Sequence, residues 1–73
     1  MTAWDLTRGK SAEITKVNLS GAAAERLTAL GFVRGAKVLS GGRSLMDSSI
    51  LLMCGAVRLA ARRCVAELIE VAQ

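Results

Sequence analysis

Histidine is absent from this chain of 73 residues, and cysteine occurs only twice. A nucleophilic cysteine normally needs a neighbouring base such as histidine, and a four-ligand metal site is normally assembled from histidines and paired cysteines. Cys54 and Cys64 are separated by nine residues and form no CxxC pair. The carboxylates form no recognisable acid–base pair: they are Asp5, Glu13, Glu25, Asp47, Glu67 and Glu70. We therefore expect no enzymatic activity, no cofactor and no metal site.

Metal analysis of protein purified without chelators checks this expectation. We expect well under one equivalent of any transition metal, because the chain offers neither imidazole nor a cysteine pair. A stoichiometric metal that is lost in Cys54→Ser or Cys64→Ser would contradict it.

Long hydrophobic runs are also missing. The longest apolar stretch, ILLMCGAV at residues 50–57, has eight residues and ends at Arg58, whereas a membrane-spanning helix needs roughly 20. The first ten residues lack the apolar segment of a signal peptide. Two cysteines fit a reducing compartment, since small disulfide-stapled secreted domains usually carry more. The sequence thus predicts a soluble cytoplasmic protein.

Aromatic residues make up only 3% of the chain, namely Trp4 and Phe32, although 52% of all residues are hydrophobic. We expect a core of Leu, Ile, Val, Met and Ala, closed by Phe32 or Val33. A domain this small buries only roughly 60% of the surface that its unfolded chain exposes. The excess of aliphatic residues therefore predicts exposed apolar surface of the kind that marks a partner.

The order of β-branched residues, glycines and serines predicts a single domain, residues 1–73, with short strands and one helix. Ile14 and Val17 are three residues apart, which predicts a bulge or an early end of the first strand there. Tight corners between short strands favour a small β-barrel. The expected strands are 11–19, 36–40, 50–54, 56–60 and 67–71; the helix is 20–31; 61–67 form a helical turn, 40–49 a turn-rich link and 1–10 a loosely held terminus.

The segment LTALGFVRGAKV, residues 27–38, predicts a tight corner between the helix and the next strand. Ser20 is a good N-cap for this helix. Gly31 stands where a left-handed residue ends a helix, and Gly35 can start the next strand from a turn because it takes positive φ without steric cost. The apolar stripe of the helix comprises Ala23, Leu27 and Leu30.

Basic side chains give an alternative class of function, because the net charge is +4. Small barrels that bind single-stranded nucleic acid combine a basic patch with aromatic stacking platforms. Trp4 and Phe32 are the only aromatic candidates, and Phe32 suits the core better. The simpler interpretation is a solvated rim of arginines, and both stay open at this point. The patch would comprise Arg58, Arg62 and Arg63 with Lys10 or Arg34.

Three segments carry a resemblance to a known family. RLTALGFVRGAKV at 26–38, DSSILLMCGAVRLAARRCVAELIEV at 47–71 and TAWDLTRGKSAEI at 2–14 are similar, in register, to characteristic elements of the FeoA family. Its members are small cytoplasmic proteins that accompany the FeoB-type ferrous iron transporter of bacteria. The family ending R-x-x-x-A-x-x-I-x-V falls on Arg62, Ala66, Ile69 and Val71.

The chain departs from the family pattern at its turns. Family members commonly carry proline where Arg34 and Ser49 stand, and this chain has no proline at all. Met46 replaces the usual glycine before Asp47. We expect the turns to be retained but less rigid, because proline no longer presets φ.

The resemblance implies a mainly β fold with one helix: a small SH3-like β-barrel with the helix inserted after the first strand. It also implies a role as an interaction module for ferrous iron uptake, docking on the cytoplasmic GTP-binding domain of a FeoB-type transporter. On this interpretation the chain binds no nucleic acid and meets the membrane only through the transporter. Self-association into a homo-oligomer stays open.

The resemblance also places a partner surface. The family's I-x-I spacing puts Ile50 and Leu52 inward, so the alternating Leu51 and Met53 face outward. Leu39, next to an inward valine, faces outward in the same way. Competing interpretations are burial of these side chains under the N-terminal segment, near Trp4, or in a homo-oligomer. The predicted partner-binding residues are Leu39, Leu51, Met53, Arg58 and Arg62.

Overall fold

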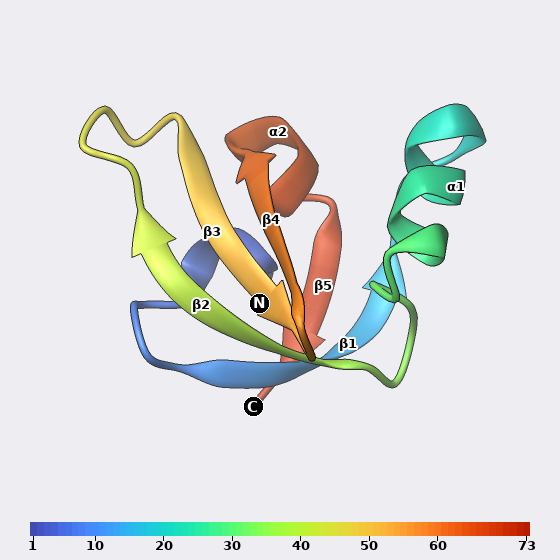
Figure 1. The fold of residues 1–73 in the computed structure, drawn as a ribbon, viewed down its shortest axis with the longest axis horizontal. Helices are drawn as coiled ribbons and strands as arrows, with labels where there is room; N and C mark the ends of the chain where they lie inside the picture. The colour runs from blue at the N-terminus through green and yellow to red at the C-terminus, as the bar shows by residue number, and fades with distance from the viewer.

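The computed structural model of the protein describes residues 1–73. Its strands form one antiparallel sheet in the order β4-β3-β2-β1-β5, which curves around the core with α1 standing at its side (Figure 1). The elements are η1 (Ala3–Asp5), β1 (Ser11–Val17), α1 (Gly21–Ala29), β2 (Lys37–Arg43), β3 (Ser49–Cys54), β4 (Val57–Arg62), α2 (Arg63–Ala66) and β5 (Ile69–Ala72). The predicted mainly β, SH3-like fold with a helix after the first strand is confirmed, although β4 and β5 do not pair and leave the barrel open.

Alternating side chains of the strands fill the interior of the curved sheet. Ile50 and Leu52 on β3 are fully buried, as predicted, and Ile14 and Val38 are buried with them. Burial of this kind is the main stabilising contribution in a domain of this size. The core cluster comprises Ala3, Trp4, Leu6, Ala12, Ile14, Leu27, Phe32, Val38, Ile50, Leu52, Ala61, Ala66, Ile69 and Val71.

The corner between α1 and β2 is confirmed. Gly31 has φ +91° and Gly35 has φ +90°. The N–H of Phe32 donates to the carbonyl of Leu27 at 2.9 Å, and the N–H of Gly31 donates to that of Thr28 at 3.0 Å. These two hydrogen bonds are those of a Schellman motif. Phe32 closes the core, as one of the two predicted alternatives.

The prediction of a loosely held N-terminus is wrong. Residues 3–5 form the short 3-10 helix η1, and both Trp4 and Leu6 are buried in the core. The carbonyl of Met1 accepts a hydrogen bond from the N–H of Val71 at 2.9 Å. The core therefore includes both aromatic residues, whereas none of the three methionines is buried.

The β1 bulge is confirmed, because the register of β1 against β5 shifts between Ile14 and Lys16. Several boundaries differ from the prediction. β1 ends at Val17, and β2 continues to Arg43 rather than residue 40, since a second bulge after Ser40 lets the chain stay paired with β3. Ser20 is the N-cap of α1, as predicted, although its side chain makes no hydrogen bond there. Of the predicted stripe, Leu27 is buried, Leu30 is half-buried against the core and Ala23 is exposed.

Candidate functional site

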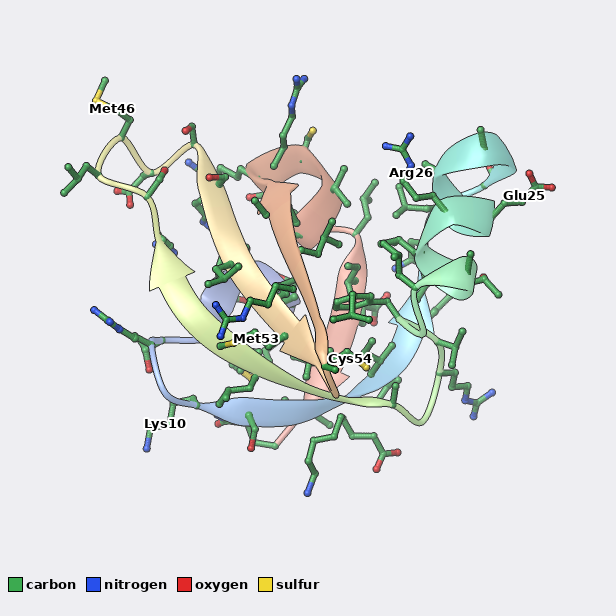
Figure 2. All side chains as sticks on the ribbon, in the orientation of Figure 1. Lys10, Glu25, Arg26, Met46, Met53 and Cys54 are labelled. Carbon is green, nitrogen blue, oxygen red and sulfur yellow. The ribbon has the colours of Figure 1, made fainter.

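The outer face of the sheet brings the predicted apolar residues together. The strand registers pair Leu39 of β2 with Met53 of β3, and Met53 with Arg58 of β4. Leu51 lies two residues along β3 on the same face, opposite Ala60. Figure 2 shows Met53 lying across the β2–β3 part of the sheet. We call Leu39, Leu51 and Met53 the outer patch.

The outer patch is partly exposed in the isolated chain. Leu39 is 39% exposed, and Leu51 and Met53 are half-buried. Leu51 covers the backbone of Gly41 so closely that a Cβ at this glycine would lie 2.7 Å from the Leu51 Cδ2 atom. Because Gly41 has no side chain, Leu51 can lie directly against the backbone of β2 at this position.

Cations border the outer patch. The predicted Arg58 and Arg62 are both exposed on β4, and Lys37 lies beside Leu39 on the same face of β2. The only ion pair in the structure joins Arg63 to Glu67, so these side chains are without carboxylate partners. Sequence reasoning did not single out a further cation, Arg8. Its aliphatic stem lies over Gly42, where an added Cβ would lie 3.4 Å from the Cβ atom of Arg8.

The N-terminal segment does not place Trp4 over the outer patch. Trp4 lies in the core, where the Arg43 guanidinium stands 4.5 Å from its ring and donates to its carbonyl oxygen. Arg43 pairs with the inward Ile50, which puts this contact on the inner side of the sheet. Trp4 and Phe32 are 5% and 1% exposed, so neither aromatic ring is available for stacking on a base.

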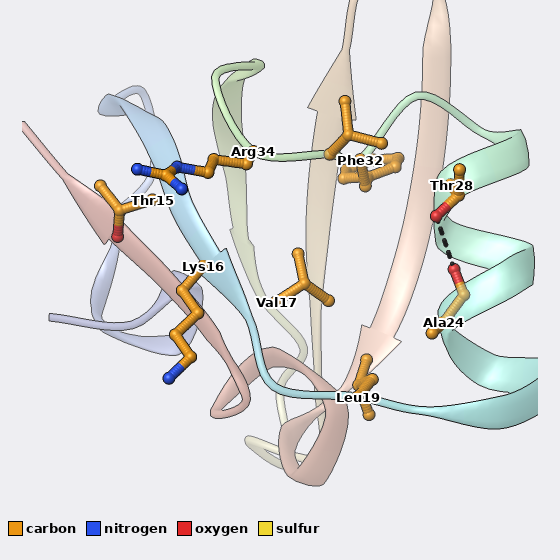
Figure 3. A pocket seen from close by; sticks show the side chains of 9 residues that line it. Thr15, Lys16, Val17, Leu19, Ala24, Thr28, Phe32 and Arg34 are labelled. Carbon is orange, nitrogen blue, oxygen red and sulfur yellow. Dashed lines mark hydrogen bonds between the residues drawn. The ribbon is translucent and has the colours of Figure 1, made fainter.

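Two hollows flank α1. The first lies between α1 and β1, and in Figure 3 Val17, Leu19 and Phe32 project from its walls. The second is an apolar groove between α1 and the edge of β4, with a volume of about 480 Å³. Its lining is Ala22, Ala23, Arg26, Leu27, Leu59, Ala60, Arg62 and Val65. Neither hollow is lined by a carboxylate.

The loop between β2 and β3 exposes a second apolar pair that sequence reasoning did not single out. Leu45 and Met46 are 104% and 86% exposed, and Met46 projects away from the fold in Figure 2. The Ser44 hydroxyl orders this loop, because it accepts hydrogen bonds from the backbone N–H groups of Ser48 and Ser49.

The titratable groups do not assemble into a metal site. Cys54 is half-buried and its thiol donates to the carbonyl of Gly31 at 3.5 Å, while Cys64 is exposed. No group of three or more His, Cys, Asp or Glu side chains converges. One carboxyl is perturbed: a hydrogen bond from the backbone N–H of Thr2 lowers the pKa of Asp5 below its usual value.

The fold and this face together define a class of protein: a small SH3-like domain with an apolar sheet face bordered by cations. The FeoA domain model matches residues 1–73. The chain therefore belongs to the FeoA family. A comparison with curated proteins gave no match.

Solved structures of similar proteins agree with this assignment. The FeoA protein of Chlorobium tepidum is 37% identical with a TM-score of 0.91, over 97% of this chain and 68% of its own. The FeoA protein of Stenotrophomonas maltophilia, described as a prokaryotic SH3 domain protein complexed with zinc, is 32% identical. This match has a TM-score of 0.83 and covers 99% of this chain and 89% of that one. Iron(II) transport protein A of Clostridium thermocellum is 30% identical with a TM-score of 0.89 over 97% of this chain, which spans only 44% of that protein.

Neither α1 nor α2 has the length and hydropathy that crossing a lipid bilayer requires.

Proposed function

We propose that this chain is a cytoplasmic accessory protein for ferrous iron uptake, which docks on the cytoplasmic GTP-binding domain of a FeoB-type transporter through the outer patch. Membership of the FeoA family supports the role in iron uptake. The Stenotrophomonas relative is described as a candidate activating factor for ferrous iron transport. The observation that carries the docking surface is the strand register that places Met53 between Leu39 and Arg58.

The chemistry of the face indicates what it binds. Leucine and methionine side chains that are partly open to solvent gain free energy when a partner covers them, and methionine adapts its shape to the partner. Arg8, Arg58 and Arg62 around them favour a partner surface with carboxylates. Because such rim charges mainly accelerate association, we expect binding to weaken as the salt concentration rises.

The double variant Leu51→Thr with Met53→Lys tests this proposal. We expect it to keep a melting temperature close to that of the wild type and to lose at least about tenfold in affinity for the transporter's GTP-binding domain, because about 1.4 kcal/mol of apolar contact is worth a factor of ten. Titration calorimetry with the purified domain measures the affinity, and ferrous iron uptake in a strain that lacks its own FeoA protein measures the function.

A matched control is available on the β2–β3 loop. Leu45→Thr with Met46→Lys makes the same chemical change at side chains that are 104% and 86% exposed, away from the outer patch. This control should bind like the wild type. Unfolding of the outer-patch variant would show that Leu51 and Met53 are core residues, and a monomeric variant of a self-associating wild type would assign the patch to a homo-oligomer. Either result contradicts docking through this face.

A further inference from the structure

One edge of the sheet is unpaired. The strand order ends at β4 on one side and at β5 on the other, and β4 pairs only with β3. The β5 edge is covered, since Thr2 forms a bridge with Glu70 and the Met1 carbonyl accepts from the N–H of Val71. The edge of β4 is thus the open one, and an open edge is a template for another strand.

The hairpin fixes which backbone groups of β4 are open. Cys54 pairs with Val57 across the two-residue turn at Gly55 and Ala56. Hydrogen-bonded and non-bonded pairs alternate along an antiparallel ladder, so Val57 and Leu59 bond to β3. The N–H and C=O groups of the intervening residues, Arg58 and Ala60, point away from β3.

The open edge at Ala60 lines the apolar groove. Helix α1 forms its other wall through Ala22, Ala23 and Leu27. Leu27, Leu59 and Val65 supply an apolar lining, and Arg26 and Arg62 supply cations. In Figure 2 Arg26 extends from α1 toward β4, while Glu25 points the opposite way. A groove between a strand edge and a helix is a form used to bind extended peptides.

We propose that this groove binds an extended acidic segment of a partner protein, which adds to the sheet as a strand beside β4. Side chains of an added strand alternate between the two faces. Those on the outer face would meet Arg58 and Arg62, so carboxylates fit there. Those on the inner face would meet Leu59 and Leu27, so small aliphatic side chains fit there. The groove shares the bordering cations Arg58 and Arg62 with the outer patch but none of its apolar side chains, so each surface is tested on residues that belong to it alone.

The same charges disfavour a second copy of this chain as the occupant. An antiparallel pair of two β4 strands centred on Ala60 would place Arg58 of one copy opposite Arg62 of the other. Like charges directly opposite each other destabilise a strand pair, and charged side chains on edge strands are a common protection against self-pairing. An acidic segment converts both repulsions into attractions.

A synthetic peptide tests the proposal: acetyl-Glu-Val-Glu-Val-Glu-Val-amide, with lysine in place of glutamate in the control peptide. Titrated into the isotope-labelled chain, the acidic peptide should shift NMR signals of β4 and α1, and the control should not. The Ala60 amide proton, open in the free chain, should become protected from exchange with solvent because it joins a new ladder. Binding without this protection would mean charge adhesion alone and would overturn strand addition.

Two substitutions on α1 test whether the peptide binds in this groove. Ala23 lines the groove and is exposed, whereas Ala29 is exposed on the same helix and lines neither hollow. Ala23→Phe should fill the groove and weaken peptide binding by about tenfold or more, and Ala29→Phe should leave it unchanged. Equal binding by both variants, no binding by the wild type, or β4-mediated dimerisation at micromolar concentration would each overturn the proposal.

Discussion

Replacing Trp4 by alanine should lower the free energy of unfolding by about 3–5 kcal/mol, the range for removing a buried Trp or Phe from a core. Trp4 is only 5% exposed and joins η1 to the remaining core. Its ring also holds the guanidinium groups of Arg43 and Arg63 at 4.5 and 5.3 Å, and such cation–π contacts each add about 0.5–1 kcal/mol at exposed sites.

This loss is large for a domain of 73 residues, whose total stability is expected to be roughly 4–11 kcal/mol at 0.05–0.15 kcal/mol per residue. Urea unfolding followed by far-ultraviolet circular dichroism measures it, since Trp4 is the only tryptophan and its fluorescence disappears with the substitution. Trp4→Phe serves as the control and should lose clearly less, because most of the apolar volume remains. If Trp4→Ala unfolds within about 1 kcal/mol of the wild type, the ring does not hold the N-terminal segment in the core.

Gly31→Val is expected to be the second large effect, with a loss of about 2–3 kcal/mol, near the upper end of the cost of holding a non-glycine residue in a sparsely populated backbone region. Gly31 has φ +91° at the end of α1. A Cβ at this position would meet no atom within 4 Å. The loss would therefore come from the backbone conformation, which β-branched residues strongly disfavour, and not from a steric clash.

Thermal unfolding of two further variants separates this cause from a general effect of valine. Gly31→Asn should lose less than Gly31→Val, because asparagine enters the left-handed region more readily. Ala29→Val introduces the same side chain at an exposed helical position and should cost only the few tenths of a kcal/mol of helix propensity. Three variants with equal melting temperatures would show that the corner does not depend on the conformation of Gly31.

The features that the sequence predicts well are those that depend on neighbouring residues. The corner follows from two glycines placed four residues apart, and alternation divides the side chains of β3 between two faces, of which the resemblance to the FeoA family identified that of Ile50 and Leu52 as inward. The outer patch was predicted on the same basis, since Leu51 and Met53 alternate with the two residues that the resemblance places inward. Its assembly from two strands depends on register, which places Leu39 opposite Met53 in the structure.

The features that were missed depend on residues far apart in the chain. Trp4 is buried by elements that the first ten residues do not specify, so its polar neighbours suggested a loose terminus. β2 runs through Gly41 and Gly42 because Ser40 is buried and its hydroxyl donates to the carbonyl of Leu6 at 3.1 Å. The groove at β4 follows from the strand order and from the position of α1, neither of which periodicity along a sequence reveals.

The pairing of the first and last segments has a consequence for biosynthesis. β1 lies between β2 and β5, and Met1 and Thr2 contact Val71 and Glu70 near the other end of the chain. These partners are separated by almost the whole chain, and contacts of such long sequence separation slow folding. While the ribosome still holds the residues of β5, one side of β1 and the pairing partners of Met1 and Thr2 are missing. The native sheet is therefore completed only after the end of β5 has left the exit tunnel, and until then the nascent chain exposes apolar strands to chaperones.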